Sequence, residues 1–135
     1  MDTVFKTYDI RGIVPQEFNT TIAQKIVQAT LDFLKIKNKP AKIIVGRDGR
    51  ISSPLIYQSV IKILKQYKNI KIIKLNLTTT PIFYWSISQL KADCGFMITA
   101  SHNPKEYNGL KIMNKKNQPI NPNDIKKYFN EKYNI

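Results

Sequence analysis

The residues best suited to chemistry lie in one short polar segment, residues 99–111. It contains a serine, Ser101, next to the chain's only histidine, His102, and a lysine, Lys111, near its end. A hydroxyl nucleophile with a cation nearby suits a covalent step on a group that carries negative charge. Pro104 fixes its own φ and pushes the preceding residue toward extended geometry, so we expect a stiff turn.

Apolar runs on both sides of this segment indicate how it is held. Residues 95–98 lead into it and residues 110–113 lead out, which predicts a strand, a polar turn and a second strand. Gly109 permits either a positive φ or a close approach of another backbone. This arrangement would place the serine at the edge of a sheet.

The arginines are a second signal, because 19 of the 22 basic residues are lysines. The arginines are Arg11, Arg47 and Arg50, and each has a glycine within one residue. A planar guanidinium binds phosphate or carboxylate through two parallel bonds, which an ammonium group cannot do. We therefore interpret these three positions as candidate anion contacts.

Structural roles compete with these interpretations. Arg11 can simply pair with Asp9, and Arg47 with Asp48 can form an ion-paired turn that adds little stability. His102 taken alone is more typical of a loop histidine than of a catalytic base. Its place beside Ser101 favours membership of the site, without assigning it acid–base chemistry.

The length and the composition of the chain limit the class of protein. A chain of 135 residues with 42% hydrophobic residues predicts one folded domain. No apolar stretch approaches about 18 residues, so we expect no membrane span. The first residues lack a secretory signal, and the lone Cys94, expected to be buried where a strand begins, cannot form an internal disulfide. These features favour the cytoplasm.

The net charge of +13 raises the alternative of nucleic-acid binding. The lysines are scattered along a chain rich in Lys, Ile and Asn, with no block of five or six like charges. No nucleic-acid-binding motif is present either. The pattern therefore favours a general lysine bias over a nucleic-acid surface.

Hydrophobic spacing predicts alternating strands and helices. We expect an extended stretch over residues 5–12 that ends in a turn. Strands are expected over residues 42–46 and 70–77, with two more that begin at Gly95 and Leu110. Helices are expected over residues 20–34, from an N-cap at Ser53 through Tyr67, and from two further starts at Thr80 and Asn121. The aromatic residues at 83–85 are interpreted as core.

This alternation predicts an α/β fold: a single three-layer domain with a mixed, mostly parallel β-sheet and helices on both faces. The last two strands have a loop too short for a helical crossover, so we expect them to be antiparallel. Loops that follow parallel strands can converge on one site at the carboxyl edge of the sheet.

Three motifs resemble the N-terminal domain, domain I, of the α-D-phosphohexomutases, the phosphomannomutase/phosphoglucomutase family. They are Tyr8-Asp9-Ile10-Arg11-Gly12, Val45-Gly46-Arg47-Asp48-Gly49-Arg50, and Thr99-Ala100-Ser101-His102-Asn103-Pro104 with Asn108-Gly109-Leu110-Lys111. The resemblance covers residues 1–135. It implies an isomerase that interconverts hexose 1-phosphate and 6-phosphate through a bisphosphate intermediate.

The resemblance also implies residue roles. Ser101 would carry the phosphoryl group and bind Mg²⁺ through that phosphate, with His102 beside it. Arg11 and Lys111 would stabilise the transferring group or move a proton. Substrate or phosphate-loop roles would fall to a further set: Arg47, Asp48, Arg50, Asn103 and Asn108. The loop of residues 47–50 would line the site and order the phosphoserine loop.

The sequence departs from the family in what it lacks. Family members have four domains, and the Asp-Gly-Asp-x-Asp metal motif, the sugar-discriminating loops and the distal phosphate loop belong to domains II–IV. We expect Mg²⁺ to need carboxylates from those domains, and glucose or mannose 1,6-bisphosphate to act as activator. The 135-residue chain is expected to be inactive alone. It is also expected to self-associate through its exposed interdomain face. The alternatives are a non-catalytic interaction or regulatory module and a nucleic-acid-binding protein.

Overall fold

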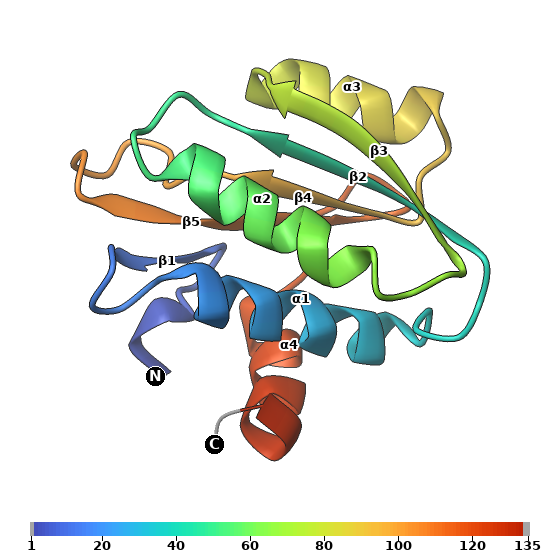
Figure 1. Cartoon of the computed structure of the whole chain (residues 1–135), viewed down its shortest axis with the longest axis horizontal. Coiled ribbons are helices and arrows are strands. Elements are labelled where there is room, and N and C mark those ends of the chain that lie inside the picture. Colours follow the sequence, from blue (N-terminus) through green and yellow to red (C-terminus); the bar gives the residue numbers. More distant parts are fainter. Residues whose placement is uncertain (1, 134–135) are drawn as a thin grey trace.

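The computed structural model describes residues 2–133, which form one α/β domain (Figure 1). Its elements in chain order are η1 (Asp2–Val4), β1 (Ile10–Ile13), α1 (Thr20–Leu34), β2 (Ala41–Arg47), α2 (Ser53–Leu64), β3 (Ile70–Leu77), α3 (Thr80–Gln89), β4 (Cys94–Ile98), β5 (Tyr107–Asn114), α4 (Pro122–Tyr128) and η2 (Phe129–Tyr133). No helix among residues 2–133 is long and apolar enough to cross a membrane.

The five strands form one mixed sheet in the order β1-β5-β4-β2-β3. β2 pairs in parallel with both β3 and β4, while β5 pairs antiparallel with β4, as the short connecting loop predicted. β1 adds a second antiparallel pair on the other side of β5. The expected turn at Gly12 is therefore wrong, because Gly12 lies inside this strand, opposite Asn108.

Helices cover both faces of the sheet, as predicted. α1, α2 and α4 pack on one face, and α3 packs on the other (Figure 1). Alternation along β2 explains this, because Ile43 and Val45 join the first core while Ile44 joins the second. All five residues of β4, including Cys94, are buried because that strand lies in the middle of the sheet and is covered on both sides.

The start of α2 differs from the expectation. Ser52, not Ser53, is the N-cap residue, and its side chain makes no capping hydrogen bond. Ser53 is the first helical residue and turns its hydroxyl toward Asp48, with an Oγ–Oδ1 distance of 2.6 Å. The helix also ends at Leu64, before Tyr67, so its predicted extent is too long.

α3 corrects the prediction that all of its aromatic residues are core. Phe83 and Ile87, one helical turn apart, are fully buried against the sheet, whereas Trp85 is 63% exposed. Residues two apart on a helix point in nearly opposite directions, so Phe83 and Trp85 cannot share the buried face.

Candidate active site

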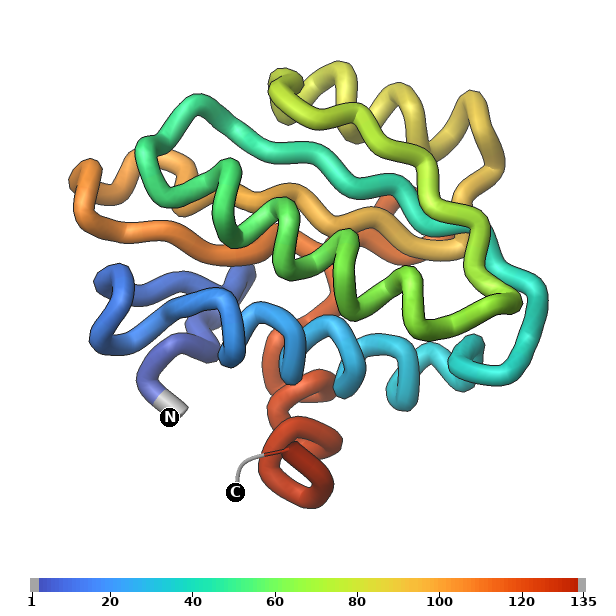
Figure 2. The backbone as a smooth tube through the Cα atoms, in the orientation of Figure 1, coloured from blue at the N-terminus to red at the C-terminus, as the bar shows by residue number. Residues whose placement is uncertain are grey.

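Two loops meet at the carboxyl edge of the sheet, after β2 and after β4. Arg47 and Ile98, the last residues of these two strands, are paired across the sheet. The backbone N–H of Asp48 then donates to the carbonyl of Ile98 at 3.0 Å. Figure 2 shows the backbones of these loops side by side. The convergence expected for loops that follow parallel strands is therefore present for this pair.

The side chain of Arg50 joins the first loop to the second. Its Nη1 donates to the carbonyls of Pro104 at 2.7 Å and Tyr107 at 3.1 Å. Its Nη2 donates to the carbonyls of Ser101 at 2.9 Å and Asn103 at 2.8 Å. The guanidinium therefore binds four backbone carbonyls in the segment that contains Ser101. The sequence had instead suggested that Arg50 contacts an anion.

Asp48 orients that guanidinium. One carboxylate oxygen lies 3.3 Å from Nε of Arg50, and the other accepts from the Arg50 backbone N–H at 3.1 Å and from Ser53. The alternative considered for Asp48, an ion pair with the Arg47 side chain, is not formed. Arg47 donates instead to the amide oxygen of Asn76 and to the backbone carbonyl of Asp48. The two arginines contact different neighbours because Arg47 ends β2, whereas Arg50 lies three residues further on, where the turn into α2 begins.

Asn108 is fully buried beneath these loops. Its Nδ2 donates to the hydroxyls of Ser52 and Ser53, each at 2.9 Å, and its Oδ1 accepts from the N–H of Gly109. The sequence placed Asn108 among the substrate or phosphate contacts. In the structure its side chain joins the start of β5 to the start of α2, and the substrate or phosphate role stays a prediction.

Ser101 stands exposed at the head of the second loop, with φ of 55°. This left-handed conformation is costly for a residue with a Cβ, and strain of this kind concentrates at functional sites. The Ser101 N–H donates to Oγ1 of Thr99 at 3.1 Å, and both the N–H and Nδ2 of Asn103 donate to the carbonyl of Ala100. The pattern of residue types did not predict the left-handed serine, because no glycine or proline marks it.

The hollow in front of Ser101 has a volume of about 440 Å³. It is lined by residues of both loops: Asp48, Gly49, Arg50, Ser101, Asn103 and Lys105. Lys105 adds an exposed positive charge that the sequence interpretation overlooked, although it follows directly after the motif's Pro104. His102 is exposed beside Ser101 and is not among the lining residues.

Arg11 and Lys111 lie on the two neighbouring strands β1 and β5. Arg11 is paired with Gly109, so Arg11 and Lys111 belong to the same face of the sheet. Nη1 of Arg11 lies 2.7 Å from Oδ1 of Asp9, which confirms the simple pairing considered for this arginine. Lys111 is half-buried opposite Met97.

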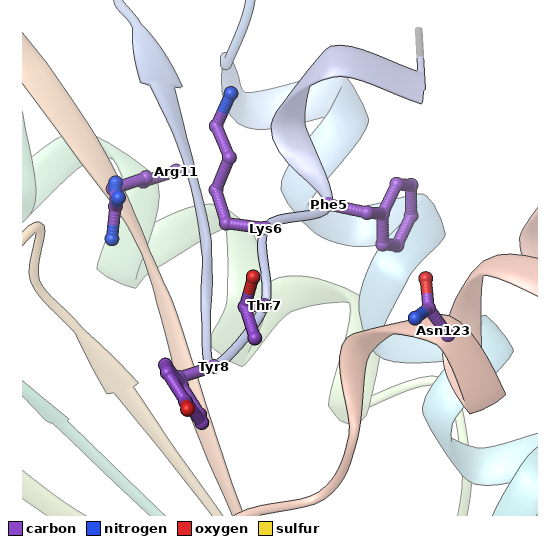
Figure 3. Close-up of a pocket in the computed structure, with 6 residues that line it drawn as sticks. All are labelled: Phe5, Lys6, Thr7, Tyr8, Arg11 and Asn123. Carbon is purple, nitrogen blue, oxygen red and sulfur yellow. The ribbon is translucent and has the colours of Figure 1, made fainter.

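Arg11 lines a second hollow, of about 650 Å³, drawn in Figure 3. In that view Arg11 and Tyr8 stand on one side of the hollow, with Phe5 and Asn123 on the other. Tyr8 is 80% exposed. Neither Ser101 nor Lys111 lines this hollow, so the predicted cations are not gathered with the serine in one cavity.

The residues present do not fit a magnesium site by themselves. Among residues 2–133, no three His, Cys, Asp or Glu side chains gather where they could hold a metal ion. The carboxylate lining the serine's hollow, Asp48, is engaged by Arg50 and Ser53. Mg²⁺ requires near-octahedral coordination by several oxygens, and one serine oxygen cannot provide it.

This fold and candidate site define an α/β/α domain that presents a loop with an exposed, left-handed serine at one edge of the sheet. The family described as phosphoglucomutase/phosphomannomutase, alpha/beta/alpha domain I, matches residues 2–134. The chain therefore belongs to the phosphoglucomutase/phosphomannomutase family, as its domain I.

Named relatives agree with this assignment. A phosphomannomutase/phosphoglucomutase of Pseudomonas syringae is 39% identical over 112 residues, covering 83% of this chain and 24% of the relative. A phosphomannomutase of Klebsiella pneumoniae is 37% identical over 118 residues, covering 87% of this chain and 72% of the relative.

Solved structures agree as well. The crystal structure of a phosphoglucomutase/phosphomannomutase family protein from Burkholderia thailandensis superposes with a TM-score of 0.83 at 25% identity, over 97% of this chain and 30% of that one. The chain thus spans about a quarter of the length of the Pseudomonas relative and under a third of this structure.

Proposed function

We propose that this chain is the phosphoryl-carrying domain of a phosphohexomutase, with Ser101 as the carrier. The observation that carries the proposal is the exposed Ser101, held left-handed at the carboxyl edge of the sheet by a loop that Arg50 binds at four carbonyls. Family membership of the chain supports the same assignment.

In the proposed reaction a hexose bisphosphate gives one phosphoryl group to Ser101. The bond from phosphorus to Oγ forms as the bond from phosphorus to the sugar oxygen breaks, and the serine proton passes to the released sugar oxygen. The phosphoserine then gives its phosphoryl group to the free hydroxyl of a hexose monophosphate, which forms the bisphosphate. The bisphosphate turns around and returns the phosphoryl group of its other position to Ser101, so the monophosphate that leaves is the isomer. Phosphoryl transfer depends on positioning and on charge stabilisation, so cations near the transferring group matter most.

The cations proposed for this task are Arg11, Lys111 and Lys105. Lys105 shares the hollow of Ser101. Arg11 lies on β1 and is oriented by its ion pair with Asp9, and Lys111 lies on the neighbouring strand β5. We propose that they stabilise the negative charge of the bound phosphate and that Arg11 or Lys111 takes part in proton transfer. His102, exposed beside Ser101, is proposed as a further contact.

The rest of the active site is proposed to come from segments outside these 135 residues. The described residues lack an oxygen cluster for Mg²⁺, so any magnesium bound at the phosphorylated serine would draw carboxylates from elsewhere. We propose that the chain alone carries phosphate without completing turnover. A cytoplasmic location fits its free, buried Cys94.

A partner surface is proposed on the side of the exposed apolar residues. α3 exposes Ile82 and Trp85 one helical turn apart, and Leu77 is 61% exposed at the end of β3. Further domains, or a second copy of the chain, would cover such residues. Sedimentation velocity of the wild type and of Trp85→Lys tests self-association, which a monomeric wild type at high concentration would contradict.

Intact-mass spectrometry after incubation with glucose 1,6-bisphosphate and Mg²⁺ tests the carrier role. We expect a gain of one phosphoryl group in the wild type, no gain in Ser101→Ala, and an unchanged gain in the control Ser59→Ala on α2. A wild type that never gains phosphate would contradict the proposal. Robust turnover of glucose 1-phosphate or mannose 1-phosphate by the chain alone, in a coupled assay, would contradict its proposed incompleteness.

A further inference from the structure

The guanidinium of Arg50 is bound by groups of the protein itself. Arginine carries five N–H groups, two on each Nη and one on Nε. The four Nη protons match four backbone carbonyls at 2.7 to 3.1 Å, and Nε faces the Asp48 carboxylate at 3.3 Å. The side chain is only 14% exposed. Arg50 therefore lines the hollow with its charge already committed to the protein's own oxygens.

The four carbonyls are spread along the loop between β4 and β5. They belong to Ser101, Asn103, Pro104 and Tyr107, so one rigid plane fixes both the beginning and the end of the loop. Direct backbone bonds within the loop are few and local, such as that from Asn103 to Ala100. The guanidinium thus supplies the cross-links that a strand or a helix would otherwise provide.

One of these bonds acts directly on the strained residue. Nη2 of Arg50 donates to the carbonyl of Ser101. The backbone torsion angles of Ser101 set the direction in which that carbonyl points. A residue with a Cβ leaves the left-handed region unless its surroundings hold it there. The bond to Arg50 would be broken if Ser101 relaxed to the common right-handed or extended conformations.

From this we infer that Arg50 is a positioning residue for phosphoryl transfer at Ser101. It keeps the loop closed and the serine left-handed through four carbonyls, so that Oγ is presented to the substrate, and it does not touch the transferring group. The inference rests on the proposed carrier role of Ser101. Lysine cannot replace it, because one ammonium group cannot reach four separated carbonyls in a plane.

Amide hydrogen exchange followed by NMR tests the hold on the loop without any substrate. In Arg50→Lys we expect the protected amides of Ser101, Asn103 and Tyr107 to exchange about tenfold faster or more, the equivalent of losing a charge-assisted hydrogen bond. The matched control is Arg47→Lys at the end of β2, since the hydrogen bonds of the Arg47 side chain go to Asn76 and Asp48 and not to residues 99–107. Unchanged exchange in Arg50→Lys would overturn the inference.

Chemical rescue separates positioning from mere stability. In Arg50→Ala, millimolar guanidinium chloride should restore both the slow exchange of the loop amides and the rate of phosphate uptake at Ser101, whereas equal sodium chloride should not. Uptake at the wild-type rate in a variant whose loop exchanges fast would overturn the positioning role and leave the carrier role standing. If the wild type takes no phosphate, the carrier role fails, and the exchange data alone decide whether Arg50 holds the loop.

Discussion

A Cβ placed on Gly109 would lie 1.9 Å from the carbonyl oxygen of Ile10 and 2.7 Å from Cα of Arg11. At this position the antiparallel pair of β1 and β5 therefore approaches so closely that only glycine fits. Of the two properties that the sequence offered for Gly109, the structure uses close approach, because no glycine among the described residues has a positive φ. This contact places Arg11 next to β5, the strand that contains Lys111.

Gly109→Ala should separate β1 from β5. The added methyl group meets backbone, which cannot move aside as a flexible side chain can, so we expect a loss of about 2 kcal/mol or more in the free energy of unfolding. Urea denaturation measures this loss. Gly49→Ala is the control, since nothing lies within 4 Å of its Cβ, and it should change stability by less than about 0.5 kcal/mol. Equal effects of the two substitutions would contradict the close contact.

Ser101→Gly should be more stable than Ser101→Ala. Both variants lack the hydroxyl, so both should fail to take up phosphate. Glycine adopts a φ of 55° without the steric cost that alanine retains, which predicts a difference of about 1 kcal/mol in favour of glycine. Thermal or urea denaturation of the pair measures it. An alanine variant as stable as the glycine variant would show that Ser101 is not held left-handed in solution.

Cys94 should be unreactive while the chain is folded. It is fully buried in β4, and burial raises the pKa of its thiol because the thiolate cannot be solvated there. A thiol reagent such as DTNB at pH 8 should label less than a few per cent of the protein in minutes, and label it completely in strong denaturant. Rapid labelling of the native chain would contradict the burial of this strand.

The contact between η2 and the end of α1 should weaken at alkaline pH. The Tyr133 hydroxyl donates to the Asp32 carboxylate and accepts from Lys37 at 3.1 Å. Burial, and then this bond to Asp32, raise the pKa of Tyr133. Burial lowers the pKa of Lys37, but its bond to Tyr133 and the nearby charges more than offset that effect, so its pKa is also raised.

The sign follows from these two raised pKa values. Tyr133 and Lys37 contribute fully to the free energy of unfolding at a pH below their unfolded-state pKa values, which lie near 10. This contribution is lost as the pH rises through their folded-state pKa values. We expect Tyr133→Phe to be less stable than the wild type at pH 8, with the difference shrinking above about pH 10. Denaturation across this range measures it. A difference that grows with pH would contradict the arrangement.

The element order was predictable because the local signals agreed with one another. The helical spacing from Thr20 to Leu34 and the strand at residues 70–77 match the structure, and so does the antiparallel hairpin around Ser101. The errors arose where packing decided the outcome. Trp85 is exposed because its face of α3 points away from the sheet, and Ser53 is drawn toward Asp48 instead of capping the helix.

The candidate site was predictable in part. Residue types and spacing singled out Ser101 and the loop of Arg50, because a serine beside the chain's only histidine and arginines beside glycines stand out in so lysine-rich a chain. They did not reveal that Arg50 binds carbonyls, that Asn108 is buried, or that Arg11 and Ser101 line separate hollows. Each of these depends on partners distant in the sequence.

The sequence by itself determined the class of fold through its hydrophobic periodicity, and the family through the resemblance of three short motifs. It also singled out Ser101, for which the carrier role is proposed, because residue types at short spacing can be read without a structure. Only the tertiary structure decided what each polar side chain binds. A guanidinium can face a phosphate or four carbonyls equally well by its chemistry, and the choice at Arg50 was made by β2 and β4 ending side by side.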